Sequence, residues 1–220
     1  MKTIRLILNL LIVAGLGLAG FYFWSSHEEV RTLKAIISRL QADSRIAQAV
    51  VTQVKPDPKT KKTFTTIKFL EYDWQNKPLA PKYFTFSGNI IQFQSLVIRF
   101  DDIYVKGADR LRGKSAYIFW KVFMLDGANT QEYEITHPRE VPQGYRLDTA
   151  KNRYEQRLWE KFWAFALDEQ SAKKAGTKNA QLEAPGTRFI PGLIYTIKIE
   201  HNGGLRIDSA PVPKILEGAR

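Results

Sequence analysis

The sequence predicts a mainly β protein: a β-sandwich or curled antiparallel sheet with one inserted amphipathic helix, preceded by an N-terminal transmembrane helix and a helical stalk. Three observations predict it: an apolar run at the start, heptad spacing after it, and later alternating runs without βαβ order. The 220 residues divide into a cytoplasmic tip and membrane helix (1–24), a stalk (25–45) and an exported β-rich domain (46–220).

The composition is that of a folded chain. Hydrophobic residues make up 44% of the sequence and aromatic residues 12%, well above the content of disordered segments. The chain has no cysteine. This excludes thiol catalysis, disulfide bonds, cysteine metal ligands and a lipoprotein anchor built on cysteine, and it leaves the redox compartment open.

The apolar run extends from Leu6 to Trp24, and Asn9 is its only strongly polar side chain. As a helix it would reach about 28 Å, close to the roughly 30 Å hydrocarbon core of a bilayer. Lys2 and Arg5 precede it, so the positive-inside rule leaves the N-terminus in the cytoplasm. The main domain is then extracytoplasmic, and periplasmic in a Gram-negative cell. The anchor residues expected to meet lipid are Leu6, Leu10, Val13, Leu16, Phe21 and Trp24.

A cleavable signal peptide is the alternative interpretation of this run. Gly17 and Ala19 supply small residues before a cut at Gly20. The anchor is favoured because the run is longer than a signal-peptide core of about 7–15 residues and continues past that cut.

A heptad pattern follows the anchor. Seam positions recur at intervals of three and four from Val30 to Val51, apolar except for Ser44, with charged residues on the flanks. The candidate oligomerisation residues are Val30, Leu33, Ile37 and Leu40. Two interpretations stay open: a short coiled coil that makes a homo-oligomer, or an amphipathic helix lying on its own domain. The β-branched residues from Val50 to Thr52 favour a strand there instead of further helix.

The exported domain is expected to become β-rich after a basic, turn-forming linker at 55–62. Both alternating faces of the 115–125 run are apolar, which predicts a central strand covered on both sides. Without βαβ order, the sheet should be mainly antiparallel. The expected strands are 64–74, 82–86, 90–100, 102–106, 115–125 and 131–135, followed by a hairpin that joins 193–199 to 205–207 through Asn202, Gly203 and Gly204.

One amphipathic helix is predicted at about 149–173, with Asp148 or Thr149 as its N-cap. Its apolar residues cover roughly 200° of its surface, more than a helix resting on one sheet requires. Burial in the core explains this width. The alternative is that an edge formed by Trp159 and Trp163 binds another subunit or a partner.

The chain carries a formal net charge of +11, with basic clusters at 55–62, 106–114 and 173–178. These clusters are either solvated loops or a surface that binds lipid headgroups, an anionic envelope polymer or an acidic envelope protein. Nucleic acid is not expected, because most aromatic residues fall at core-like positions and the domain is predicted to be exported. The candidate partner-binding residues are Trp159, Trp163, Arg110, Arg112 and Lys114.

No catalytic residue, metal site or cofactor is predicted. His27, His137 and His201 lack a second histidine at ligand spacing. The sequence has no Gly-x-Ser-x-Gly elbow and no Walker-type phosphate loop. The carboxylates that a hydrolase would need to bring together are Asp101, Asp102, Glu132 and Glu134.

These observations predict a single-pass envelope protein, bound to the lipid bilayer through residues 6–24, whose outer β-domain is a protein-interaction or assembly module. The alternative is a membrane-tethered module that binds a carbohydrate or lipid. An envelope hydrolase is the third interpretation. Binding of a ligand would use aromatic residues beside a basic rim, for which the candidates are Trp74, Tyr83, Trp120, Tyr145 and Tyr195.

Overall fold

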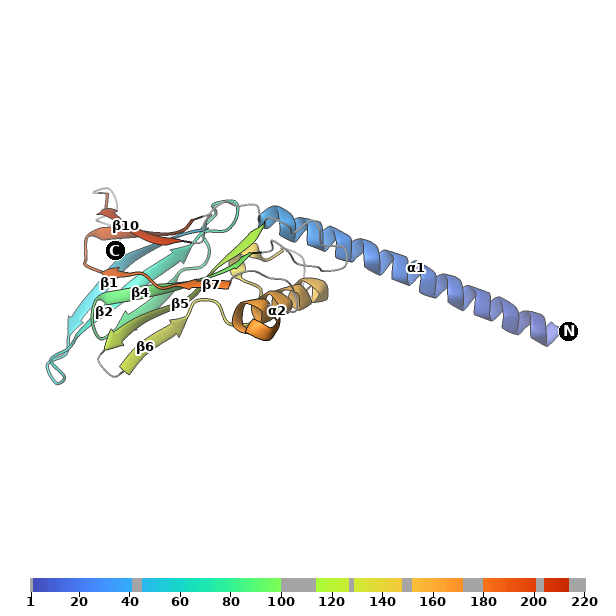
Figure 1. Cartoon of the computed structure of the whole chain (residues 1–220), viewed down its shortest axis with the longest axis horizontal. Helices are drawn as coiled ribbons and strands as arrows, with labels where there is room; N and C mark the ends of the chain where they lie inside the picture. Colours follow the sequence, from blue (N-terminus) through green and yellow to red (C-terminus); the bar gives the residue numbers. More distant parts are fainter. Residues whose placement is uncertain are drawn as a thin grey trace.

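The computed structural model of the chain describes residues 2–40, 45–99, 114–126, 129–147, 152–171, 180–200 and 204–213. A long N-terminal helix leads into two antiparallel β-sheets, and a second helix lies beside them (Figure 1). The predicted mainly β fold with antiparallel pairing is confirmed.

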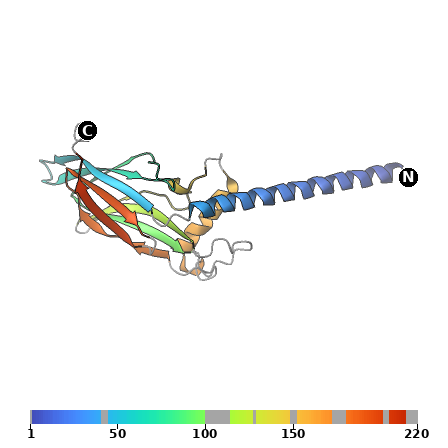
Figure 2. The ribbon, with the colours of Figure 1, turned by 90° about the horizontal axis from the view of Figure 1, so that it is seen from above.

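Helix α1 (Lys2–Arg39) is unbroken and projects from the domain as a rod in both views (Figures 1 and 2). The anchor residues Val13, Leu16, Phe21 and Trp24 are all exposed, by 66–69%. The side chains of Leu6 and Leu10 lie outside the described residues. Among the helices that the structure describes, none is both long and apolar enough to span a membrane.

The domain end of α1 packs against the rest of the chain. Ile36 and Leu40 are 0% and 3% exposed, and Leu33 and Ile37 pack partly against the same cluster, whereas Val30 is 45% exposed. This packing agrees with the interpretation of the stalk as an amphipathic helix that lies on its own domain. The helix ends at Arg39, and β1 begins at Arg45.

The first sheet has the strand order β10-β9-β1-β2-β3. The predicted turn-forming linker at 55–62 is confirmed as a turn at 57–62, but its first two residues, Lys55 and Pro56, belong to β1. The carboxylate of Asp57 accepts hydrogen bonds from the Lys59 N–H (3.0 Å) and the Thr60 hydroxyl (2.6 Å), which fixes this turn. The strands are β1 (Arg45–Pro56), β2 (Thr63–Glu71), β3 (Lys82–Phe86), β9 (Leu193–Ile199) and β10 (Leu205–Pro211).

The second sheet has the order β6-β5-β4-β7, and β8 also pairs with β4. Strands β7 and β8 were not predicted, because runs of four and three residues are too short to show alternation. The expected strand at 102–106 lies outside the described residues. The strands are β4 (Ile90–Arg99), β5 (Ser115–Asp126), β6 (Asn129–Glu134), β7 (Ala180–Glu183) and β8 (Gly186–Arg188).

The inner faces of the two sheets share one hydrophobic core. Phe69 of β2 stacks on Phe93 of β4 with ring centroids 5.4 Å apart, and it meets Phe119 of β5 edge-on at 5.7 Å. Aromatic pairs in these geometries stabilise a core beyond the area they bury. The two sheets therefore form a sandwich.

Strand β5 is covered on both sides, as predicted, but its alternation changes at Trp120. Ser95 pairs with Phe119 and Gln94 pairs with Lys121, so Trp120 is an extra residue in β5. Such a bulge reverses which later side chains point inward. Met124 accordingly faces the sandwich core, whereas sequence alternation places it with Ile118 on the other face.

Helix α2 (Arg153–Leu167) covers the outer face of β4 and β5. The predicted start of this helix is wrong, since its N-cap is Asn152, whose side chain accepts hydrogen bonds from the N–H groups of Tyr154 (2.9 Å) and Glu155 (3.3 Å). Asp148 and Thr149 lie outside the described residues. The width of the apolar face is explained because α2 packs against both the sheet and the end of α1.

The two tryptophans of α2 lie inside the domain. Trp159 is 0% exposed and Trp163 is 1% exposed, in the cluster that joins α2 to β4, β5 and α1. The interpretation of these residues as a partner-binding edge is corrected, because neither indole leaves any surface for a partner in this conformation.

Candidate functional site

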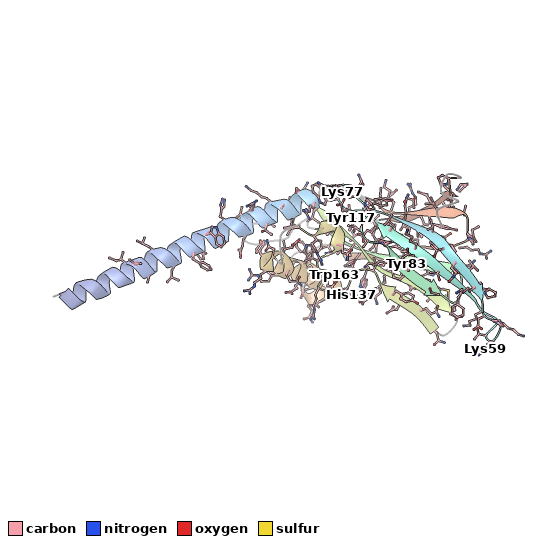
Figure 3. The ribbon with its side chains drawn as sticks, turned by 180° about the vertical axis from the view of Figure 1, so that it is seen from behind. Lys59, Lys77, Tyr83, Tyr117, His137 and Trp163 are labelled. Atoms are coloured by element: carbon pink, nitrogen blue, oxygen red, sulfur yellow. The ribbon has the colours of Figure 1, made fainter. Side chains whose placement is uncertain are left out.

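A pocket of ≈ 450 Å³ lies where the end of α1 meets the sandwich. Three separate segments line it: Arg39 at the end of α1, the β2–β3 loop at 73–79, and the segment 143–147. Figure 3 shows Lys77 of that loop beside the domain end of α1. We call this site the junction pocket.

Arg39 is held at the pocket by the polypeptide backbone. Its Nη1 donates to the carbonyl oxygen of Tyr145 (3.0 Å) and to that of Arg146. Its guanidinium carbon lies 5.3 Å from the ring centroid of Trp74, within cation–π range. One side chain therefore connects α1 to both loop segments of the pocket.

The β2–β3 loop is organised by Asp73. The Oδ1 of Asp73 accepts hydrogen bonds from the N–H groups of Gln75 and Lys77, each at 2.8 Å, and the Asp73 N–H donates to the Lys77 carbonyl at 2.8 Å. Asn76 adopts a left-handed φ of 60°, which asparagine tolerates better than most residues. This short turn places Trp74, Gln75 and Lys77 along one wall.

A second wall is fixed by Tyr145, which belongs to a single 3-10 turn (Gln143–Tyr145). The Tyr145 ring is 1% exposed and lies 5.2 Å from the Trp159 ring, and its hydroxyl accepts from the Tyr117 N–H at 3.0 Å. The buried core thus positions Gln143 and Arg146, whose side chains are exposed. Both residues line the pocket.

Glu155 lies behind this wall and is 3% exposed. Its Oε1 accepts a hydrogen bond from the Leu147 N–H at 3.0 Å. Burial raises the pKa of Glu155, and the Leu147 hydrogen bond and the charges of Arg39 and Arg146 offset part of that rise.

The lining of the junction pocket is basic. It contains three cationic side chains, Arg39, Lys77 and Arg146, and one carboxylate, Asp73. Within the described part of the chain, neither Lys77 nor Arg146 forms an ion pair. The pocket therefore offers two cations that an anion could bind, beside an indole and the amides of Gln75 and Gln143.

The predicted aromatic residues do not converge on one surface. Tyr145 and Tyr195 are 1% and 2% exposed, in different cores, and Trp120 is half-buried against Trp163 at 6.4 Å. Tyr83 is 58% exposed on β3. Trp74, 37% exposed, is the aromatic residue of this set that lines the junction pocket.

The predicted basic and acidic site residues lie elsewhere. Lys114 is half-buried at the start of β5, while Arg110, Arg112, Asp101 and Asp102 lie outside the described residues. On β6, Glu132 pairs with Lys121 at 3.2 Å, and Glu134 pairs with His137. In the described segments, no cluster of three metal-ligating side chains occurs.

Two further motif spacings are present in the sequence but were not predicted. Gly15, Gly17 and Gly20 match Gly-x-Gly-x-x-Gly, but they lie within α1 instead of at a strand-to-helix turn, so they form no phosphate loop. Ser171 and Lys174 have Ser-x-x-Lys spacing. The Ser171 hydroxyl donates to Asp168, and Lys174 lies outside the described residues.

Arg39, Lys77 and Arg146 were not predicted as site residues, because they come from segments far apart in the chain. The one local signal was the turn-forming run from Asp73 to Pro78, which presents a tryptophan and a lysine. Comparison of the chain with protein-family models, curated proteins and solved structures gave no match.

Proposed function

We propose that this chain is a single-pass membrane-anchored envelope protein, whose outer β-domain is an interaction or assembly module. The observation that carries the proposal is the form of α1. Its described side chains from 12 to 24 are exposed and mostly apolar, whereas one face of its last turns packs into the domain. An apolar helix with no polar face avoids water most simply in a bilayer.

The same helix would set the distance between bilayer and domain. From Trp24 to Arg39 it is continuous, and its rise of 1.5 Å per residue gives about 22 Å. Because Ile36 and Leu40 pack in the core and Arg39 binds two backbone carbonyls, the helix would hold the domain in a fixed orientation.

The uncovered face of the first sheet supports an interaction role. A row of paired residues, one from each strand, crosses the whole sheet on this face. In strand order it consists of Ala210, Ile194, Val50, Lys68 and Tyr83. None of these side chains is buried, and α2 covers the other sheet. Interfaces that bind proteins without forming a permanent complex are about as apolar as the rest of a protein surface, so what favours binding here is the breadth of this face and its lack of cover.

Membrane insertion is tested by a charge placed in the middle of the apolar run. Leu16→Arg should abolish co-flotation of the full chain with lipid vesicles, because an arginine at the centre of a membrane helix costs about 2.5–3.5 kcal/mol. Leu16 is 69% exposed, so the change removes no packing inside the domain. Val30→Arg is the matched control, since Val30 is an exposed residue of the same helix beyond Trp24. Equal flotation of both variants would refute the anchor.

The assembly role is tested by cross-linking and by mass. A photoreactive residue at position 83 of the vesicle-bound chain should give a defined cross-linked product, and one at position 59, at the far end of the domain (Figure 3), should not. Light scattering in detergent then separates a second copy of the chain from another protein. Identical labelling at both positions would mean that the sheet face has no preferred partner.

The junction pocket favours a second candidate function, a membrane-tethered module that binds a small ligand. Its volume of ≈ 450 Å³ falls in the range of small-molecule sites, about 300–1,000 Å³. Binding of a ligand by the purified chain, weakened by Lys77→Gln, would support this function.

A further inference from the structure

We propose that the junction pocket binds a phosphate monoester carried on a polar group of about the size of a sugar ring. The phosphate would lie between Lys77 and Arg146, and the ring would contact Trp74. This inference rests on the second candidate function; the binding site itself does not depend on the membrane anchor, and only the choice between a soluble and a lipid source does.

The charges of the pocket favour an anion. The one lining carboxylate, Asp73, already accepts two backbone hydrogen bonds at 2.8 Å, which hold it in the loop turn. Arg39 is likewise engaged with two carbonyl oxygens and the Trp74 ring. Lys77 and Arg146 remain, exposed and without an ion pair among the described residues.

The number and type of these cations favour a phosphate monoester over a carboxylate. A phosphate monoester carries about 1.5–2 negative charges at neutral pH, which matches two cations, whereas a carboxylate carries one. The planar fork of Arg146 can donate two parallel hydrogen bonds to phosphate, and Lys77 of the β2–β3 loop adds a compact charge to the same pocket.

The rest of the lining favours a ligand larger than a bare anion. A volume of ≈ 450 Å³ leaves room for a ring beside the phosphate. The Trp74 indole offers an apolar surface, and the side-chain amides of Gln75 and Gln143 can each donate and accept hydrogen bonds, as hydroxyl groups require. Because the walls are held by the Asp73 turn and the Tyr145 core contacts, the site is formed before a ligand arrives.

A phosphate monoester of this kind can be a soluble sugar phosphate or the headgroup of a phosphorylated lipid. If α1 is the membrane anchor, the pocket stands about 22 Å beyond Trp24. The headgroup layer is only about 5–8 Å thick, so a lipid of the same leaflet would not reach the pocket. A soluble or polymer-borne sugar phosphate is therefore the favoured source.

The test is calorimetric titration of the full chain in neutral detergent. The probes are glucose 6-phosphate, glucose, inorganic phosphate and short-chain phosphatidic acid. Glucose 6-phosphate should bind most tightly, and Lys77→Gln and Arg146→Gln should each weaken it about tenfold or more, the range for a charged hydrogen bond. Trp74→Leu should weaken glucose 6-phosphate more than inorganic phosphate, because it removes the surface for the ring and leaves Lys77 and Arg146 in place.

Lys59→Gln is the matched control, because it removes one exposed lysine at the opposite end of the domain (Figure 3). Lys77 and Arg146 lie on different segments, so a local folding defect caused by one substitution would not explain weaker binding in the other variant. Circular dichroism of each variant checks that it is folded.

Four outcomes would overturn the proposal. If glucose binds as tightly as glucose 6-phosphate, the phosphate does not contribute to recognition. If inorganic phosphate binds as tightly as glucose 6-phosphate, the ring does not contribute. Binding of phosphatidic acid alone would replace the soluble source by a lipid. Binding that Lys59→Gln weakens as much as Lys77→Gln would indicate a general charge effect. The Leu16→Arg variant should bind glucose 6-phosphate normally, so failure of the anchor and failure of the pocket are distinguishable.

Discussion

The guanidinium carbon of Arg39 lies 5.3 Å from the ring centroid of Trp74, while its Nη1 donates to the carbonyl oxygens of Tyr145 and Arg146. The last residue of α1 is thereby joined to the β2–β3 loop and to the segment before α2. This single side chain connects the projecting helix to the domain and shapes the junction pocket.

We therefore expect Arg39→Gln to lower the free energy of unfolding by about 2–3 kcal/mol, from the loss of charge-assisted hydrogen bonds and the cation–π contact. Arg39→Lys should recover little of it, because lysine lacks the planar fork that reaches two carbonyls. Urea denaturation of the full chain in neutral detergent measures both. Lys34→Gln, an exposed change in the same helix, is the control, and equal loss in it would contradict this role.

The two buried tryptophans of α2 should respond differently to the same substitution. Trp163 Nε1 donates to the Glu140 carbonyl at 2.8 Å, whereas Trp159 Nε1 is buried and has no partner among the described residues. Both changes to phenylalanine remove similar volume, but Trp163→Phe also loses a hydrogen bond and should cost about 1 kcal/mol more than Trp159→Phe. Thermal unfolding of the two variants under one condition measures the difference. The reverse order would show that packing at Trp159 dominates.

Glu155 should make stability depend on pH. Its pKa is raised in the folded state above the ordinary value of 4.5, chiefly by burial. Between the unfolded and folded pKa values the native state binds more protons, so the free energy of unfolding falls as pH rises through this window. Glu155→Gln should lack that fall. Denaturation from acid to neutral pH measures the free energy of unfolding of both proteins. The contributions of titratable groups that they share cancel in the difference between them. A difference that does not change with pH would contradict this prediction.

Asn152 serves two purposes that substitution can separate. Its Oδ1 caps α2, and its Nδ2 donates to the Thr32 hydroxyl of α1 at 2.8 Å. Asn152→Ala should cost about 1–2 kcal/mol through the lost cap, and Asn152→Asp should cost less, because aspartate caps helices well but cannot donate to Thr32. Thr32→Val isolates the second contact. Chemical denaturation ranks the three variants, and an Asn152→Asp loss equal to that of alanine would show that the contact between the helices outweighs the cap.

Local pattern was enough to predict the β-rich, antiparallel fold. Strand β3 occupies the predicted residues 82–86, and the hairpin of β9 and β10 follows its alternation, because side-chain direction in a strand repeats every two residues. The pattern failed where one residue altered the geometry. The Trp120 bulge changes which side chains of β5 face the core. The Trp120 carbonyl accepts hydrogen bonds from the main-chain N–H groups of Ile135 (2.8 Å) and Thr136 (3.2 Å). These residues lie fifteen or more positions later in the chain, beyond the reach of a local pattern.

The sequence by itself determined the apolar N-terminal run, the β content and the amphipathic helix, since each depends on residues that are close in the chain. Only the tertiary structure decided that Trp159 and Trp163 are core residues, because an apolar helix face looks the same whether its own domain or a partner covers it. The junction pocket was likewise decided by folding. Arg39, Lys77 and Arg146 acquire a common chemistry only when three distant segments meet, and no local spacing encodes that meeting.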